Sequence, residues 1–151
     1  MAAKILVVDD EPSIVRLVKT TLEARGYAVI EAHDGIEALS EAKMYKPDLI
    51  LLDIMMPHMD GREARKQLLE DDRTKNIPVI HLSAVGDFES QLKAVSDGIT
   101  GYITKPFTPS DLAQQVADML DPKKREQVMK EHGRKEDKLR AIVDIMHRDK
   151  K

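Results

Sequence analysis

Short β-forming runs and longer amphipathic segments alternate five times along this chain, and this alternation limits the possible folds more than any other feature. The runs at Ile5, Leu49 and Val79 are nearly all apolar, as expected for parallel strands that are buried on both faces. Strand, helix and strand in repeated succession predict an α/β fold with right-handed crossovers. The predicted strands are Lys4–Val8, Tyr27–Ala32, Asp48–Leu52, Ile77–Leu82 and Thr100–Ile103, and the predicted helices are Ser13–Arg25, Gly35–Tyr45, Gly61–Asp71, Asp87–Asp97 and Pro109–Leu120.

Three of the predicted helices begin with a capping signal. In each case a residue that can cap a helix is followed, three positions later, by an acid, so that side chains can satisfy free amides of the first turn. These pairs are Asp34 with Glu37, Asp60 with Glu63, and Thr108 with Asp111. Local signals and periodicity therefore agree on where these helices start.

The charge distribution divides the chain into two parts. Residues 1–120 carry 13 basic and 20 acidic residues, a net charge of −7, whereas residues 121–151 carry 11 basic and 7 acidic residues, a net charge of +4. Because the composition changes abruptly after residue 121, we expect one domain over residues 1–120 and a charged helical tail over residues 121–151. An acidic body repels nucleic-acid phosphates, so we expect no direct binding of nucleic acid, but clustered carboxylates attract a hard cation.

The sequence lacks the features of a secreted or membrane protein. It has no cysteine, which excludes disulfides and thiolate metal sites. The apolar run Ile5–Val8 is too short for a signal peptide and ends in acid, and no stretch approaches the roughly 20 apolar residues of a membrane helix. We therefore expect a cytoplasmic protein without a membrane partner.

Polar residues follow four of the predicted strands, at the edge of the sheet where open α/β folds bind ligands. They are Asp9 and Asp10 after the first strand, Asp53 after the third, Ser83 after the fourth and Lys105 after the fifth. Adjacent carboxylates at the end of a buried strand need a positive partner, and one ammonium does not balance three carboxylates. The remaining negative charge favours a divalent cation, and oxygen ligands suit Mg²⁺.

Four motifs at these strand ends resemble those of the receiver domains of two-component response regulators. The resemblance runs from about Lys4 to Leu120, and its motifs are VVDD, LLDIMMPHMDG, HLSA and YITKPF, in order and at the expected separations. It implies a doubly wound five-stranded parallel sheet of order 2-1-3-4-5 with helices on both faces, to which the tail adds a C-terminal helical extension. It also implies a phosphoacceptor protein of a two-component or phosphorelay system.

The resemblance assigns the phosphoryl chemistry to a small set of residues. Asp53 would accept a phosphoryl group from the phosphohistidine of a histidine kinase or a histidine phosphotransfer protein, forming an acyl phosphate. Asp10, Asp53 and the backbone carbonyl of Met55 would hold Mg²⁺, while Asp9 would act directly or through water. Mg²⁺ and Lys105 would neutralise charge on the transferring oxygens.

Further residues are expected to set access to Asp53 and the lifetime of its phosphoryl group. Ser83 would donate its hydroxyl to a phosphoryl oxygen, Ala84 is small enough to leave access to Asp53, and the bond before Pro106 is cis in the family. Met55 and Val85 stand where relatives often have polar groups that steer the hydrolytic water. Because both are apolar, we expect slow self-dephosphorylation.

Signalling is expected to depend on one bistable element. Movement of Ser83 toward the phosphoryl group would open a space in which Tyr102 can turn from exposed to buried. This change would reshape the face formed by helix Asp87–Asp97, strand Thr100–Ile103 and helix Pro109–Leu120. A homodimer through this face or through the C-terminal helix is a possible output.

Two other functional classes compete with the receiver hypothesis. An Asp-dependent phosphohydrolase of the haloacid-dehalogenase type needs a second Asp two positions after its nucleophile, where this chain has Met55. A phosphorylation-independent interaction module would usually have lost one of the residues Asp9, Asp10, Asp53, Ser83 or Lys105, and none is missing. We therefore expect a protein that catalyses only its own phosphorylation and slow dephosphorylation, and no enzyme in the wider sense.

The tail, residues 121–151, has a helical pattern but is too short for a DNA-binding or catalytic output domain. Its strongest apolar patch runs from Leu139 to Met146. Three interpretations stay open. The tail can pack on its own domain or on a second copy, contact a partner, or begin a linker to a further domain.

Overall fold

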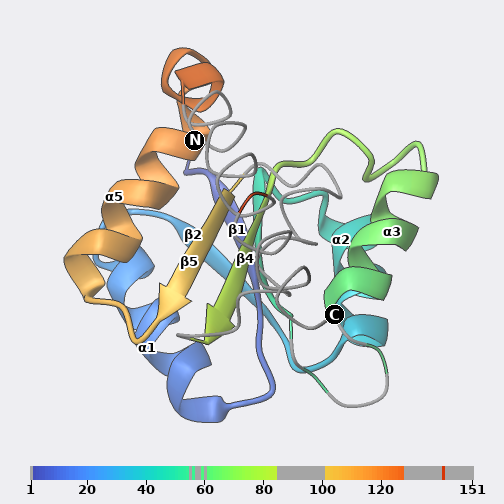
Figure 1. Cartoon of the computed structure of the whole chain (residues 1–151), viewed down its shortest axis with the longest axis horizontal. Coiled ribbons are helices and arrows are strands. Elements are labelled where there is room, and N and C mark those ends of the chain that lie inside the picture. Colours follow the sequence, from blue (N-terminus) through green and yellow to red (C-terminus); the bar gives the residue numbers. More distant parts are fainter. Residues whose placement is uncertain are drawn as a thin grey trace.

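A computed structural model of the chain contains a parallel sheet between helices (Figure 1). The sheet has five strands in the order β2-β1-β3-β4-β5. The strands are β1 Lys4–Val8, β2 Ala28–Ala32, β3 Leu49–Asp53, β4 Val79–Ala84 and β5 Gly101–Lys105, and the helices are α1 Pro12–Glu23, α2 Gly35–Tyr45, α3 Gly61–Glu70 and α5 Pro109–Leu120. The structure describes residues 2–54, 56, 59, 61–84, 101–127 and 141, without the side chains of Arg62, Ser83, Ala84 and Tyr102. The predicted α/β fold and strand order are confirmed.

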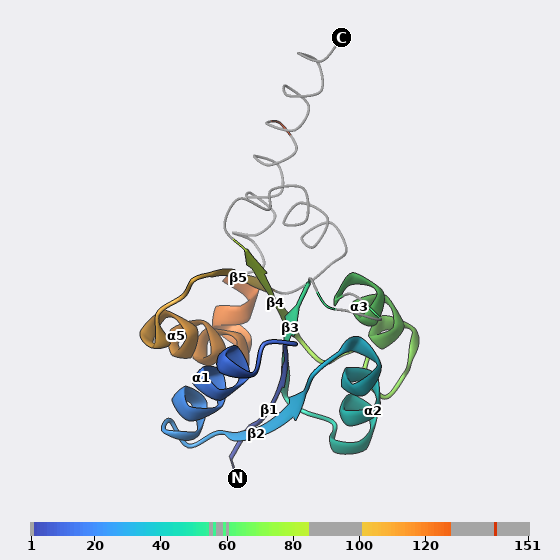
Figure 2. The same cartoon turned by 90° about the horizontal axis from the view of Figure 1, so that it is seen from below.

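The described helices cover both faces of the sheet in two pairs (Figure 2). α1 and α5 pack together on one face, and α2 and α3 pack together on the other. Ile5 and Val7 of β1 belong to the core beneath α1 and α5, whereas Leu6 and Val8 belong to the core beneath α2 and α3. Successive residues of a strand point to opposite faces, so a strand covered on both sides must be apolar throughout.

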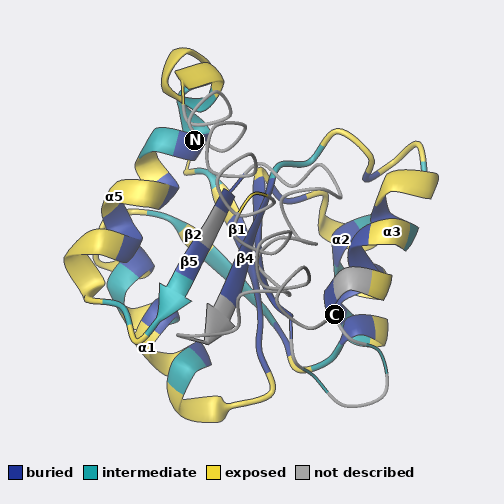
Figure 3. Cartoon of the chain, viewed as in Figure 1, coloured by how far each residue is buried: buried dark blue, intermediate teal, exposed yellow. Residues whose placement is uncertain are grey.

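β3 lies at the centre of the sheet and holds the backbone that leads to Asp53. It pairs with β1 on one side and with β4 on the other. Its residues Leu49, Ile50, Leu51 and Leu52 are wholly inaccessible to solvent, and Figure 3 shows the buried sheet between helices with exposed outer faces. Truncation of one such side chain to alanine typically destabilises a protein by about 2–5 kcal/mol. The strand that carries Asp53 is therefore fixed from both edges and both faces.

Two of the predicted helix caps are present. Asp34 Oδ1 accepts a hydrogen bond from the N–H of Glu37 at 2.7 Å, and Thr108 Oγ1 accepts one from the N–H of Asp111 at 3.1 Å. A cap of this kind contributes about 1 kcal/mol because it satisfies an amide that the helix leaves free. The third predicted cap, Asp60, lies outside the described residues, as does the predicted helix Asp87–Asp97.

Three strands extend one or two residues beyond their predicted ends. β3, β4 and β5 end at Asp53, Ala84 and Lys105, and Ser83 lies within β4. Asp53, Ser83 and Lys105 were predicted to follow their strands, and this was wrong. The ladder continues through the pairs Asp53–Leu82 and Ala84–Lys105, because backbone pairing does not require apolar side chains.

The tail begins with a short helix that is hydrogen-bonded to α5. Asp121 interrupts the helix with extended backbone (φ −92°, ψ 115°), and residues 122–127 are helical again. The Asp121 carboxylate accepts a hydrogen bond from the N–H of Lys123 at 3.0 Å, and Arg125 Nε donates to the carbonyl of Met119 at 2.7 Å. This break lies at the predicted domain boundary, although the division into one domain and a tail stays a prediction.

The rest of the tail, including the apolar patch Leu139–Met146, lies outside the described residues except for Ala141. The proposed interpretations of the tail therefore stay open. Within the described ranges, no helix has both the length and the apolar character needed to cross a membrane.

Candidate functional site

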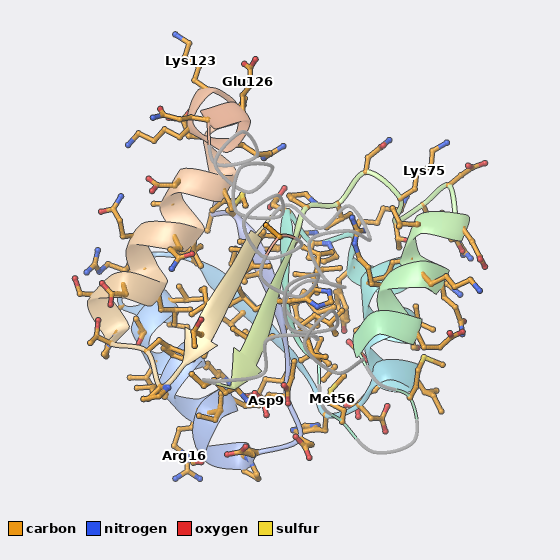
Figure 4. The ribbon with its side chains drawn as sticks, viewed as in Figure 1. Asp9, Arg16, Met56, Lys75, Lys123 and Glu126 are labelled. Atoms are coloured by element: carbon orange, nitrogen blue, oxygen red, sulfur yellow. The ribbon has the colours of Figure 1, made fainter. Side chains whose placement is uncertain are left out.

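Three carboxylates lie together at the carboxyl end of the sheet. Asp9 and Asp10 follow β1, and Asp53 ends the neighbouring strand β3. One oxygen of each carboxylate lies within 4.8 Å of the other two. Asp9 is fully buried, Asp53 is 5% exposed and Asp10 is exposed. Figure 4 shows Asp9 at this end of the sheet, with Met56 of the β3–α3 connection on the same side of the molecule.

The ammonium group of Lys105 lies between two of these carboxylates. Its Nζ donates a hydrogen bond to Asp9 Oδ2 at 2.8 Å and lies 3.6 Å from Asp53 Oδ2. Lys105 ends β5, so its side chain reaches across the ends of β4 and β3 to contact Asp9. The peptide bond between Lys105 and Pro106 is cis, the isomer that the resemblance implies.

Burial and the neighbouring carboxylates shift the pKa of Lys105 in opposite directions. Partial burial disfavours the ammonium and by itself lowers the pKa of Lys105. The hydrogen bond with Asp9 and the negative charges of Asp53, Asp9 and Glu11 outweigh burial, so the pKa of Lys105 is raised above its ordinary value. Lys105 therefore stays positively charged throughout the physiological pH range.

The turn after β1 holds the buried carboxylate of Asp9. The N–H of Asp9 donates to the carbonyl of Ala32 at 3.2 Å, and the N–H of Glu11 donates to Asp9 Oδ1 at 2.9 Å. With Lys105 on Oδ2, both oxygens of Asp9 have donors, as a buried charge requires. The contact of the Glu11 N–H with Asp9 was not predicted from the sequence. Its signal is Pro12, which marks the first helical position and leaves the preceding amide in the turn.

The backbone on both sides of Asp53 is held by hydrogen bonds. The N–H of Ile54 donates to the carbonyl of Leu82 at 3.2 Å and continues the contact between β3 and β4 beyond Asp53. The N–H of Gly61, the first residue of α3, donates to the carbonyl of Ile54 at 2.8 Å. This second bond holds the first residue of α3 against the residue that directly follows Asp53.

The carboxylate cluster has the donors of a site for a hard divalent cation. Among the described residues, these three carboxylates lie beside one ammonium, that of Lys105, which leaves an excess of negative charge at neutral pH. Two of the three carboxylates are buried, so repulsion between them is poorly screened by water. Mg²⁺ prefers carboxylate and water oxygens, and the exposed Asp10 leaves the cluster open to water. The residues present therefore fit the Mg²⁺ that the resemblance implies.

Three other predicted site residues lie on β4 and β5. Ser83 pairs with Thr104, and Ala84 pairs with Lys105, so both backbones lie at the carboxyl end of the sheet. Tyr102 lies on β5, the strand of the predicted switch face. Because the side chains of Ser83, Ala84 and Tyr102 are outside the description, their roles stay predictions.

Met55 and Val85 lie outside the described residues altogether. The expected metal-binding carbonyl of Met55 and the expected effect of both residues on phosphoryl lifetime therefore also stay predictions. The same is true of the switch face as a whole, since its helix Asp87–Asp97 is not described, although β5 and α5 are.

Comparison with known families agrees with this geometry. The sequence profile described as the response regulator receiver domain matches residues 5–117. The chain belongs to this family. The matched residues of the receiver domain include Asp9, Asp10, Asp53 and Lys105. The family inferred from the four sequence motifs is thus confirmed, and with it a place in two-component signalling.

The receiver domain has relatives among transcriptional regulators. It is 44% identical over 120 residues to the alkaline phosphatase synthesis transcriptional regulatory protein PhoP of Bacillus subtilis, which covers 80% of this chain and 49% of PhoP. It is 39% identical over 117 residues to the DNA-binding dual master transcriptional regulator RpaA of Synechocystis, which covers 78% of this chain and 48% of RpaA. The chain therefore spans about half the length of these curated relatives.

Solved receiver structures share the fold. The chemotaxis response regulator CheY4 of Vibrio cholerae matches with a TM-score of 0.73 and 36% identity, over 78% of this chain and 98% of CheY4. The receiver domain of the sensor histidine kinase PA1611 of Pseudomonas aeruginosa matches with a TM-score of 0.74 and 27% identity, over 80% of this chain and 98% of that domain. The PA1611 domain was solved with a magnesium ion coordinated in its active site cleft.

Proposed function

We propose that this receiver domain accepts a phosphoryl group on Asp53 from the phosphohistidine of a histidine kinase or a histidine phosphotransfer protein. The observation that carries the proposal is the meeting of Asp9, Asp10 and Asp53 with Lys105, whose Nζ lies 3.6 Å from Asp53. Phosphoryl transfer asks a protein mainly to position the reactants and to neutralise charge on the phosphoryl oxygens. A buried nucleophilic carboxylate beside an ammonium and a cation-binding cluster meets both requirements.

In the transfer step, a carboxylate oxygen of Asp53 bonds to phosphorus while the bond from phosphorus to the donor's histidine nitrogen breaks. The electron pair of that bond stays on the nitrogen, and Asp53 carries an acyl phosphate. Lys105 is bonded to Asp9 before the reaction and is close enough to Asp53 to turn toward a phosphoryl oxygen. It offers charge rather than a proton, because its ammonium is stabilised by its carboxylate neighbours.

Asp10, Asp53 and the backbone carbonyl of Met55 would hold Mg²⁺, with Asp9 acting directly or through water. When bound, Mg²⁺ supplies further neutralisation of charge on the phosphoryl oxygens. The acidic cluster supports this assignment, because its three carboxylates lie within 4.8 Å of one another and share only Lys105 among the described cations.

The remaining residues complete the proposal. Ser83 would donate a hydrogen bond to a phosphoryl oxygen and couple phosphorylation to rotation of the Tyr102 side chain. Ala84 would leave space for the phosphoryl donor. Met55 and Val85 would leave the hydrolytic water unguided, so the acyl phosphate would be long-lived. The protein would act on its own phosphoryl group only, without turnover of a separate phosphoester substrate.

The output of the domain is proposed from its relatives and from its charge. PhoP and RpaA are transcriptional regulators in which a domain of this kind accounts for about half the length. We propose a cytoplasmic stand-alone regulator, a relay protein or the receiver part of a longer regulator. Residues 1–120 have a net charge of −7 and would not bind nucleic acid directly. A homodimer would use the switch face or the tail.

Incubation with Mg²⁺ and a small phosphodonor, followed by intact-mass measurement, tests the site. The wild type is expected to gain one phosphoryl group, Asp53→Asn none, and Asp72→Asn the same as the wild type, because Asp72 is an exposed acid away from the site. Equal labelling of Asp53→Asn would show that another residue is the acceptor. Light scattering on the same samples tests the output: a doubled mass indicates dimerisation, and an unchanged mass favours a relay or a different partner.

A further inference from the structure

Gly61 packs directly against the backbone of Asp53. It is the buried first residue of α3, and its N–H donates to the carbonyl of Ile54 at 2.8 Å. A Cβ atom at this position would overlap the carbonyl oxygen of Asp53 and would lie 2.9 Å from Ile54 Cα. These neighbours are backbone atoms at the end of the central strand, so no flexible side chain can move aside.

Gly35 makes the same kind of close approach from α2. A Cβ atom on Gly35 would lie 2.8 Å from the carbonyl oxygen of Met59 and 2.9 Å from Met59 Cβ. Met59 is half-buried and belongs to the connection between β3 and α3. Gly35 therefore packs against Met59, and Gly61, two residues further along the chain from Met59, packs against the backbone of Asp53.

The two glycines are needed for space and not for an unusual backbone conformation. Among the described glycines only Gly26 has a positive φ, of 90°. Gly35 and Gly61 each begin a helix, where alanine has the better intrinsic propensity. The absence of a side chain at both positions therefore allows the start of α3 to lie close to the backbone of Asp53, and Met59 to lie close to the start of α2.

We infer that Gly61 and Gly35 are positioning residues for phosphoryl transfer, because they let the start of α3 and Met59 pack closely enough to fix the direction in which Asp53 presents its carboxylate. The inference rests on the proposed role of Asp53 as the acceptor. β3 is paired on both edges and cannot yield to an added methyl group. The peptide after Asp53 must rotate or the start of α3 must move, and either change alters the 3.6 Å separation between Asp53 and Lys105.

The test compares Gly61→Ala and Gly35→Ala with Gly26→Ala as a matched control. Gly26 precedes β2 at the opposite end of the strands, and nothing lies within 4 Å of an added Cβ there. Its substitution strains the left-handed backbone and destabilises the protein without touching Asp53. The measurements are the rate constant of Asp53 labelling at saturating phosphodonor and Mg²⁺, and the thermal unfolding of each variant.

Gly61→Ala is expected to label about 10- to 100-fold more slowly than the wild type, since a misplacement of about 1 Å at a reacting group has an effect of this size. Gly35→Ala is expected to show a smaller decrease, and Gly26→Ala to label at the wild-type rate although it unfolds at a lower temperature. Saturating phosphodonor ensures that the change reports the chemical step and not donor binding.

Wild-type labelling rates in folded Gly61→Ala and Gly35→Ala would overturn the inference. So would an equal decrease in Gly26→Ala, because the loss would then follow general destabilisation. If Gly61→Ala does not fold, Gly35→Ala decides, since its methyl group meets the half-buried Met59 rather than the central strand. Absence of labelling in the wild type would instead overturn the proposed function, and the positioning role with it.

Discussion

Two ion pairs of equal length have different surroundings in this protein. Lys105 Nζ lies 2.8 Å from Asp9 at the end of the sheet, and Arg73 Nη2 lies 2.8 Å from Asp71 in the turn after α3. The side chain of Asp9 is fully buried, whereas that of Asp71 is 21% exposed and that of Arg73 is 57% exposed. Distance alone therefore does not say what an ion pair contributes, because the surroundings decide how strongly its charges interact.

The Asp71 carboxylate at the surface is fully bonded by its cationic neighbour, whereas Lys105 in the site is shared by several carboxylates. Asp71 accepts three hydrogen bonds from Arg73, from the backbone N–H at 2.8 Å, Nε at 3.1 Å and Nη2 at 2.8 Å. Lys105, by contrast, lies among the carboxylates of Asp9, Asp10 and Asp53. The Asp71 carboxylate, which Lys43 also approaches to 3.8 Å, has enough cationic partners and stabilises a turn. The largely buried cluster has more carboxylates than described cations and is a place where a cation or an anionic group can be bound.

The sharpest way to separate the two pairs is to remove the cation from each. Lys105→Met leaves the buried carboxylate of Asp9 without a counter-charge, which is expected to lower the free energy of unfolding by about 3 kcal/mol in EDTA. It should also slow labelling of Asp53 by about 100-fold or more, since a preorganised charge at the phosphoryl oxygens is lost. Denaturant unfolding and intact-mass kinetics give the two values.

Arg73→Met is the control for this substitution on the exposed pair. It should change stability far less than Lys105→Met and leave the labelling rate as in the wild type, because Arg73 lies in a solvent-exposed turn. Equal losses of stability or of labelling in the two variants would contradict the distinction between a functional and a structural pair.

The next prediction concerns the excess of negative charge in the site. Mg²⁺ should stabilise the wild type, by about 2.7 kcal/mol at a hundredfold excess over its Kd, because it binds the folded cluster and not the unfolded chain. Asp10→Asn removes one of three repelling carboxylates, so it should raise Tm in EDTA and reduce the gain from Mg²⁺. Asp72→Asn, at an exposed acid, should leave that gain unchanged. An equal gain in Asp10→Asn and the wild type would exclude Asp10 from the cation site.

The position of the site could be predicted from the sequence, but its internal contacts could not. The strands predicted from periodicity bring Asp9, Asp53 and Lys105 to one edge, because parallel strands share a direction. Which carboxylate Lys105 bonds was not predictable. The choice of Asp9 over Asp53, at 2.8 Å against 3.6 Å, depends on register across four strands and on the reach of one side chain.

The exposed pair of Arg73 and Asp71 was not predicted from the sequence. The predicted third helix, Gly61–Asp71, included Asp71, whereas α3 ends at Glu70. The Asp71 carboxylate bonds the N–H of Arg73 two residues later and so closes a turn that ends the helix. Helical periodicity does not register such local competition between a side chain and the backbone, which is why helix ends are harder to predict than helices.

The smallest expected effect is the pH dependence of the exposed pair. The side-chain hydrogen bonds of Arg73, together with its backbone N–H, hold the pKa of Asp71 well below its usual range. A lowered folded-state pKa gives stability that is present above the ordinary pKa of about 4 and fades as pH falls, because the unfolded chain takes up the proton first. Asp71→Asn should therefore have a slightly lower Tm than the wild type at pH 7, and the difference should narrow between about pH 5 and pH 3.

Salt provides a second check on the same carboxylate, because screening weakens exposed pairs more than buried ones. High salt should narrow the Tm difference between Asp71→Asn and the wild type, while Asp53 labelling stays equal in both proteins. A Tm difference that is constant with pH would assign the loss to hydrogen bonds that do not need the ionised carboxylate. Slower labelling in Asp71→Asn would instead show that the turn after α3 is coupled to the site, and the two ion pairs would no longer be independent.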